Sequence, residues 1–177
     1  MFRFTISSLL VLAVTTVILG ASSLAHAGES CQPVFDALTK VVTTQSHTYT
    51  THTATSAHGK PRTSETIYAD GKVFIQGNGK WMTGHVEPKE ILEQQKENRE
   101  HSKATCQFVR NEIVGSESAA VYSMHSENDG SKEDAQVWIS KSTGLLLRDE
   151  QDVDVGGLAG KEHRSTRVEY GNIRPPM

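Results

Sequence analysis

The sequence predicts a mainly β domain of the α+β class, in which one curled antiparallel sheet packs its concave side against an N-terminal helix and a helical insertion. Three observations lead to this prediction. Residues 46–56 are crowded with threonine, a β-branched residue that favours extended strands. Asp70-Gly71 is a strong hairpin signal, because both residues tolerate positive φ. From residue 107 onward, turn signals recur about every 8 to 12 residues, and seven or more strands cannot form a flat sheet.

The N-terminus has the three zones of an export signal. Arg3 supplies positive charge, a run of about 14 mostly apolar residues follows from Ile6 to Leu19, and Ala25-His26-Ala27 matches the small-residue pattern of a signal peptidase site. The sequence therefore predicts a signal peptide over residues 1–27, cleaved after Ala27. An uncleaved anchor is the alternative, but the apolar run is shorter than the roughly 20 residues that cross a bilayer. A lipoprotein would need a cysteine directly after the cut.

Cleavage would leave residues 28–177, which are 177 − 27 = 150 residues, the size of one domain without a membrane span. Because the removed segment carries Arg3 and no acid, the remainder has 17 basic and 21 acidic side chains, a net charge of −4. This balance argues against a nucleic-acid partner, since phosphate binding needs clustered positive charge.

Helical periodicity predicts one amphipathic helix over about 33–44, where Val34, Ala37, Leu38 and Val41 share a face. Residues 46–84 are then expected to form a meander of four short strands. A charged helix from about residue 86 to 102 has few apolar anchors and is expected to face solvent. The second half predicts a further meander, with strands over 107–114, 119–125, 135–140, 145–155 and 162–170.

Cys31 and Cys106 are the two cysteines of the chain, and both follow the expected cleavage site. In an oxidising compartment an even pair predicts one structural disulfide. Two reduced buried thiols are the alternative. A redox pair would be expected to have C-x-x-C spacing, which these residues lack.

The sequence offers no established catalytic or metal-binding motif. Seven histidines remain after cleavage. His47 and His52 share a predicted strand but point to opposite faces, and the other five fall in different elements without metal-ligand spacing. The acidic run from Glu127 to Asp134 lacks the ligand pattern of a calcium loop and is better explained as a hairpin turn. No nucleophile elbow or phosphate-binding glycine loop occurs. We therefore expect a protein that is not an enzyme and has no cofactor, and a secreted hydrolase is the weakest alternative.

The apolar residues of the predicted helix and strands are the candidates for a ligand cavity. A period of two places Tyr122 and Met124 on one strand face, and likewise Leu145 and Leu147. A filled core explains such residues equally well. If the curled sheet leaves space beside the first helix, the expected lining residues are Leu38, Val41, Trp81, Tyr122, Met124, Trp138, Leu145 and Leu147.

Segment 137–150, VWISKSTGLLLRDE, resembles the strand–turn–strand signature W-I-x-x-x-T-G-L-P-x-R of the periplasmic lipoprotein-carrier superfamily (LolA/LolB-like), with Leu146 in place of the proline. Two later stretches, from Asp152 to Gly157 and from Arg167 to Tyr170, are similar to the strands that follow in the family. The order of signal, helix, meander, helical insertion and meander is similar as well. The resemblance implies a half-open β-barrel with a helix in its concave side, and a binding role without catalysis.

Two functions follow as hypotheses from this resemblance and the apolar strand faces. The first is a periplasmic carrier that holds a hydrophobic ligand or a lipoprotein acyl chain in the concavity. The second is an envelope adaptor that has the same fold with a filled core and binds a protein partner or senses stress.

Overall fold

The computed structural model describes residues 30–54, 60–77, 79–128, 130–154 and 160–176. The predicted signal peptide lies outside these ranges. The elements, in chain order, are α1 (Gln32–Thr43), β1 (Ser46–Ala54), β2 (Arg62–Ala69), β3 (Lys72–Gly77), β4 (Lys80–Thr83), α2 (Pro88–His101), β5 (Lys103–Val114), β6 (Glu117–Asn128), β7 (Ser131–Ser140), β8 (Leu146–Asp154) and β9 (Lys161–Tyr170).

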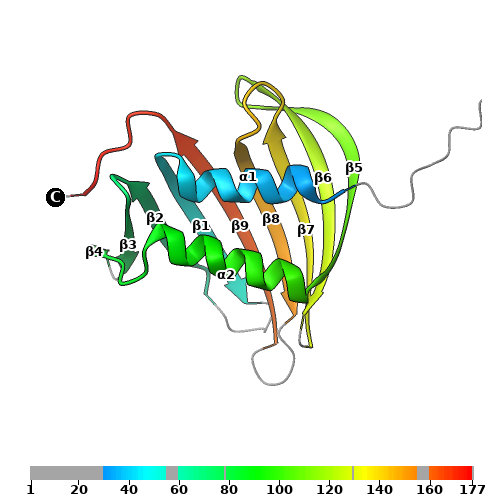
Figure 1. The fold of residues 1–177 in the computed structure, drawn as a ribbon, viewed down its shortest axis with the longest axis horizontal. Coiled ribbons are helices and arrows are strands. Elements are labelled where there is room, and N and C mark those ends of the chain that lie inside the picture. Colours follow the sequence, from blue (N-terminus) through cyan, green and yellow to red (C-terminus); the bar gives the residue numbers. More distant parts are fainter. Residues whose placement is uncertain (1–29, 55–59, 78, 129, 155–159, 177) are drawn as a thin grey trace, which may run out of the picture.

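The nine strands form one antiparallel sheet with the order β4-β3-β2-β1-β9-β8-β7-β6-β5. Two meanders, β1–β4 and β5–β9, are joined where β1 pairs with β9, from Ser46 opposite Tyr170 to Ala54 opposite Glu162. The sheet is curled but not closed, because β4 and β5 stand at opposite ends of the strand order. Both helices lie on the same side of the sheet (Figure 1). This arrangement confirms the predicted fold class and is consistent with a half-open barrel.

We call the sheet face that carries α1 and α2 the inner face, and the opposite one the outer face. On the inner face, Val34, Ala37 and Val41 of α1 are buried against the strands. Their strand neighbours in this core are Cys106, Met124, Ala135, Val137, Ile139, Leu146 and Val168. A smaller cluster lies on the outer face and consists of Ala119, Val121 and Trp138. Large apolar side chains therefore occupy both faces of the sheet.

The hairpin between β2 and β3 forms as its sequence predicts. Asp70 and Gly71 have φ values of 52° and 69°, the positive pair that a tight two-residue hairpin turn requires. Helix α2 also agrees with its composition: within Pro88–His101 no residue is buried. In the described part of the chain, no helix combines the length and apolar character that a membrane crossing needs.

Two register shifts interrupt the predicted alternation of side chains. One lies between Phe108 and Arg110, and the other between Trp138 and Ile139. The second shift places Leu146 opposite Ile139 in the inner core and lets Leu147 pack against the outer cluster. Leu145 precedes β8 and belongs to the turn. The expectation that Leu145 and Leu147 share a strand face is therefore wrong.

Candidate functional site: a cavity between the helices and the sheet

The inner face holds a cavity of about 510 Å³ between α1, α2 and strands β5–β9. Its apolar wall consists of Phe35, Leu38, Ala104, Met124 and Val153. A volume of this size lies within the range of small-ligand pockets, roughly 300 to 1,000 Å³. Space for a ligand therefore exists beside the first helix.

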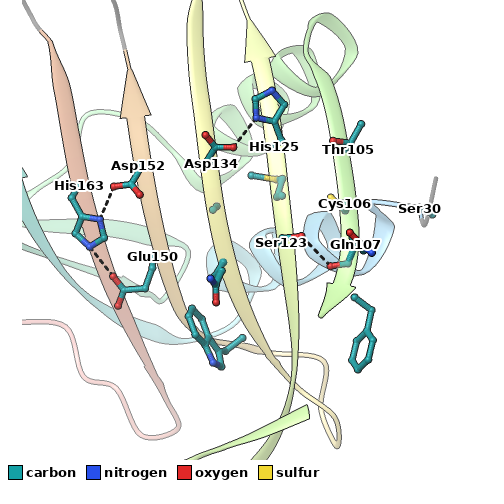
Figure 2. Close-up of a pocket in the computed structure, with 15 residues that line it drawn as sticks. Ser30, Thr105, Cys106, Gln107, Ser123, His125, Asp134, Glu150, Asp152 and His163 are labelled. Carbon is teal, nitrogen blue, oxygen red and sulfur yellow. Dashed lines mark hydrogen bonds and ion pairs between the residues drawn. The ribbon is translucent and has the colours of Figure 1, made fainter. Parts of the chain in front are cut away.

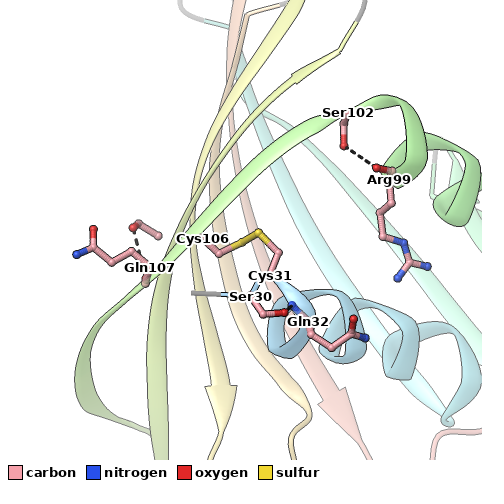
Figure 3. The surroundings of a disulfide bond; sticks show 8 residues. Ser30, Cys31, Gln32, Arg99, Ser102, Cys106 and Gln107 are labelled. Carbon is pink, nitrogen blue, oxygen red and sulfur yellow. Dashed lines mark hydrogen bonds between the residues drawn. A yellow bond between two sulfur atoms is a disulfide. The ribbon is translucent and has the colours of Figure 1, made fainter. Parts of the chain in front are cut away.

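The disulfide between Cys31 and Cys106 fixes the start of α1 against β5 (Figure 3). The two Cα atoms are 5.0 Å apart and the residues are separated by 75 positions in the sequence. The predicted pairing is thus confirmed. Because the bond anchors the N-terminal end of α1, it holds Phe35 and Leu38 over the strands that form the cavity floor.

The rest of the cavity wall is more polar than the sequence predicts. It comprises Gln95, Asn98, Arg99, Ser102, Ser126, Asn128, Ser131, Lys132, Glu133, Gln151 and Arg164. Two of its three cations are already paired: the Arg164 Nε atom lies 2.7 Å from Glu162 Oε1, and Lys132 Nζ lies 2.9 Å from Glu127 Oε1.

Arg99, on α2, is placed differently from the other two cations. Its guanidinium carbon lies 5.3 Å from the centroid of the Phe35 ring, and its Nε donates a 3.0 Å hydrogen bond to the Gln95 carbonyl. Among the described residues Arg99 has no carboxylate partner within ion-pair distance. Its charge therefore sits above the apolar wall of the cavity.

Two carboxyl groups of the inner face, those of Glu133 and Asp149, are partly or fully buried. Burial raises the pKa of Glu133, and the charge of Arg164 opposes this effect. Asp149, in β8, is only 4% exposed, and burial followed by repulsion from Glu133 raises its pKa to about 7. The Gln151 Nε2 atom donates a 2.5 Å hydrogen bond to Asp149 Oδ2, while Asp149 Oδ1 has no partner among the described residues.

The outer face carries a separate groove of about 1,420 Å³ (Figure 2). One cross-strand row in it contains His125, Asp134, Asp152 and His163, on β6, β7, β8 and β9. His125 Nδ1 is 2.7 Å from Asp134 Oδ1, and His163 Nδ1 is 2.8 Å from Asp152 Oδ1. The pKa of each histidine is raised, mainly by the hydrogen bond to the neighbouring aspartate.

This row does not form a metal centre. Over the ranges that the structure describes, no group of three or more histidine, cysteine, aspartate or glutamate side chains is arranged to hold a metal ion. The histidines and aspartates are instead bonded to one another in pairs.

The eight residues that the sequence predicts as cavity lining fall into four places. Leu38 and Met124 line the inner cavity, while Val41 and Tyr122 belong to the core beside it. Trp138 and Leu147 pack together on the outer face. Trp81 also lies there, with its ring edge against His47, and Leu145 is in the turn before β8. The structure thus brings two of the eight to the cavity, and ligand contact by any of them stays a prediction.

The polar residues of the inner face are absent from the sequence-based site. A signal for them exists, because Glu133 has the same parity in its strand as the buried Ala135 and Val137. Asp149 likewise shares parity with Gln151 and the buried Val153. A charged residue in phase with core residues indicates a polar group that faces the interior.

No family model matches the chain, and no curated protein matches it. Among solved structures it is similar to LprF from Mycobacterium bovis, with 9% identity, a TM-score of 0.41, and coverage of 80% of this chain and 93% of that one. It is similar to MucB in complex with MucA(peri), with 11% identity, a TM-score of 0.46, and coverage of 82% of this chain and 57% of that one. A LolA superfamily protein from Nitrosomonas europaea has 9% identity, a TM-score of 0.29, and coverage of 82% and 96%.

A LolA superfamily protein is thus among the structural neighbours, as the sequence resemblance implies. Over its described residues the chain is a curled, open, nine-stranded sheet with a remote similarity to LolA-like proteins.

Proposed function

We propose that this protein is an exported, non-catalytic carrier that holds the apolar part of a ligand in the cavity between α1 and the sheet. The observation that supports the proposal is the cavity itself: about 510 Å³ of space with Phe35, Leu38 and Met124 in its lining. A fully packed interior would leave no such space. The N-terminal export pattern favours a periplasmic location for the domain, after cleavage behind Ala27.

The proposed ligand is a lipid or an acyl chain. Its tail would lie against the apolar wall, since burying apolar surface drives binding, and its polar end would meet the residues of β7–β9. The disulfide and the helix that it anchors would keep the cavity formed when it is empty, which reduces the ordering cost of binding.

The test uses the purified mature protein and a matched pair of variants on β6. Ser126→Trp places a large ring in the cavity, while Ser123→Trp places the same ring on the outer face of the same strand. We expect the unmodified protein to release co-purified lipid on organic extraction and to bind the apolar fluorophore N-phenyl-1-naphthylamine. Ser126→Trp should lose that binding and Ser123→Trp should keep it. The carrier proposal fails if the unmodified protein binds neither lipid nor fluorophore.

A protein-binding adaptor is the second candidate function, and the edge strand β5 favours it. Val109 and Ile113 on this strand are 46% and 65% exposed. An edge strand with exposed apolar side chains can add a strand from a partner. Pull-down with Ile113→Lys as the control separates this function from the carrier: the adaptor predicts a partner that the variant loses, with fluorophore binding unchanged.

A further inference from the structure

We propose that the ligand of the inner cavity carries a hydrogen-bond-donating head group, an amine above all, which binds the carboxylate of Glu133. This inference rests on the proposed carrier function and specifies the chemistry of its ligand. It follows from the polar atoms around the cavity that lack partners within the described structure.

Glu133 lies on the inner face of β7, opposite Val153 of β8, and lines the cavity. Its side chain makes no hydrogen bond or ion pair within the ranges that the structure describes. A half-buried carboxyl group without a partner is costly, so a ligand that supplies a donor there would gain a charge-assisted hydrogen bond.

Other unpartnered atoms around the cavity are acceptors as well. Gln95 Oε1 on α2 and Asn128 Oδ1 on β6 are buried without a hydrogen bond to any described residue, and both side chains line the cavity. Deeper on the inner face, Asp149 Oδ1 has none either. Acceptors in excess match a head group with several N–H or O–H donors.

The cations of the cavity wall do not offset this excess of unpartnered acceptors. The charges of Arg164 and Lys132 are offset by Glu162 and Glu127. Arg99 is the lining cation without a carboxylate partner in the described part of the chain, and it lies over Phe35 at the apolar wall. An anionic head group would therefore have to bind beside the apolar wall and leave Glu133 unsatisfied.

The test compares three ligands with the same tail: dodecylamine, dodecanol and dodecanoate, at pH 8. Each competes with N-phenyl-1-naphthylamine for the purified mature protein. We expect dodecylamine to compete about tenfold more tightly than dodecanoate, the factor that one charge-assisted hydrogen bond supplies. Dodecanol should fall between them, since its hydroxyl donates without a charge.

Two glutamate variants assign the preference to the cavity. Glu133→Gln keeps the side-chain shape and should bring the amine and the carboxylate ligand to equal affinity. Glu112→Gln removes a carboxylate from the outer side of β5 and should leave the tenfold gap unchanged. Fluorophore binding by both variants shows that the cavity is intact.

The outcomes separate this inference from the proposed function. Competition by none of the three ligands overturns the carrier proposal itself. Equal competition by all three, or tightest competition by dodecanoate, keeps the carrier and overturns the head-group assignment. A preference for the amine that Glu133→Gln does not change would also overturn it, because the recognising group would then lie elsewhere.

Discussion

The Nζ atom of Lys40, in the last turn of α1, donates a 2.9 Å hydrogen bond to the carbonyl of Thr143, which is 103 residues away. Thr143 and Gly144 form the turn of the segment that resembles the carrier signature. A Cβ atom added at Gly144 would lie 2.6 Å from Lys40 Nζ, and Gly144 has a φ of +68°. The glycine of this turn thus serves both the backbone conformation and the approach of the Lys40 side chain.

Gly144→Ala should destabilise the fold more than Gly115→Ala. Both positions have positive φ, which costs a residue with a Cβ about 1–2 kcal/mol. Only at Gly144 would the new methyl group also displace Lys40, because nothing lies within 4 Å of the corresponding position at Gly115. Urea unfolding measures the two free energies, and equal losses would show that the lysine contact contributes nothing.

Replacing Cys31 and Cys106 by serine should lower the free energy of unfolding by about 4 kcal/mol, the chain-entropy value for a loop of this length. The two residues are separated by 75 positions. Chemical denaturation of the double variant measures the loss. Dithiothreitol should destabilise the unmodified protein to a similar degree and have no effect on the variant, and a variant that still responds to it would contradict the account.

Asp149→Asn should stabilise the protein at pH 8 and have little effect at pH 4. The pKa of Asp149 is raised to about 7 in the folded protein, against an ordinary value of 3.8. The folded state therefore binds an extra proton between these values, and this contribution to stability is lost as the pH rises through 7. The gain at pH 8 should be about 2 kcal/mol, below the roughly 4 kcal/mol that the full shift corresponds to.

Thermal unfolding at both pH values checks the Asp149 prediction, with Asp70→Asn as the control. Asp70 is exposed in the turn between β2 and β3, where asparagine also tolerates positive φ. Equal stabilisation of Asp149→Asn at pH 4 and pH 8 would mean that burial of the charge is not the cause.

His125 and His163, the two histidines of the outer-face row, should titrate independently. Asp134→Asn should return the pKa of His125 toward its ordinary value, because the hydrogen bond from that aspartate is the main cause of its rise. His163 should be unaffected, since its partners are Asp152 and Glu150. NMR titration of the ring protons measures both values in one sample, and a shift of both histidines would show that the row acts as one coupled unit.

Local features of the fold were predictable and non-local ones were not. The turn at Asp70-Gly71 forms because both residues tolerate positive φ, and this property depends only on two neighbouring residues. The pairing of β1 with β9 joins residues over 100 positions apart, and no local pattern specifies it. The bulge beside Trp138 reverses which leucines of the next strand face inward, and periodicity alone does not reveal such a shift.

The candidate site is likewise predictable only where local periodicity decides which way a side chain faces. Helix and strand periodicity identify the inward faces of Leu38 and Met124, so the sequence predicts both at the cavity. It predicts Trp138 there as well, since large apolar residues are expected inside, yet this sheet buries them on both faces. It does not predict Glu133, because an acid is expected in solvent, although its parity with Ala135 indicates the interior.

The ladder between β1 and β9 has a consequence for how the chain is assembled. β1 is made first and β9 last, so the β1–β9 ladder that joins the two meanders cannot form until the final strand has been synthesised. A product that ends before residue 161 would lack β9, and the edges of β1 and β8 that pair with it would be bare. Both bare edges would be open to other chains, so incomplete copies of this protein should aggregate rather than persist as half-folded monomers.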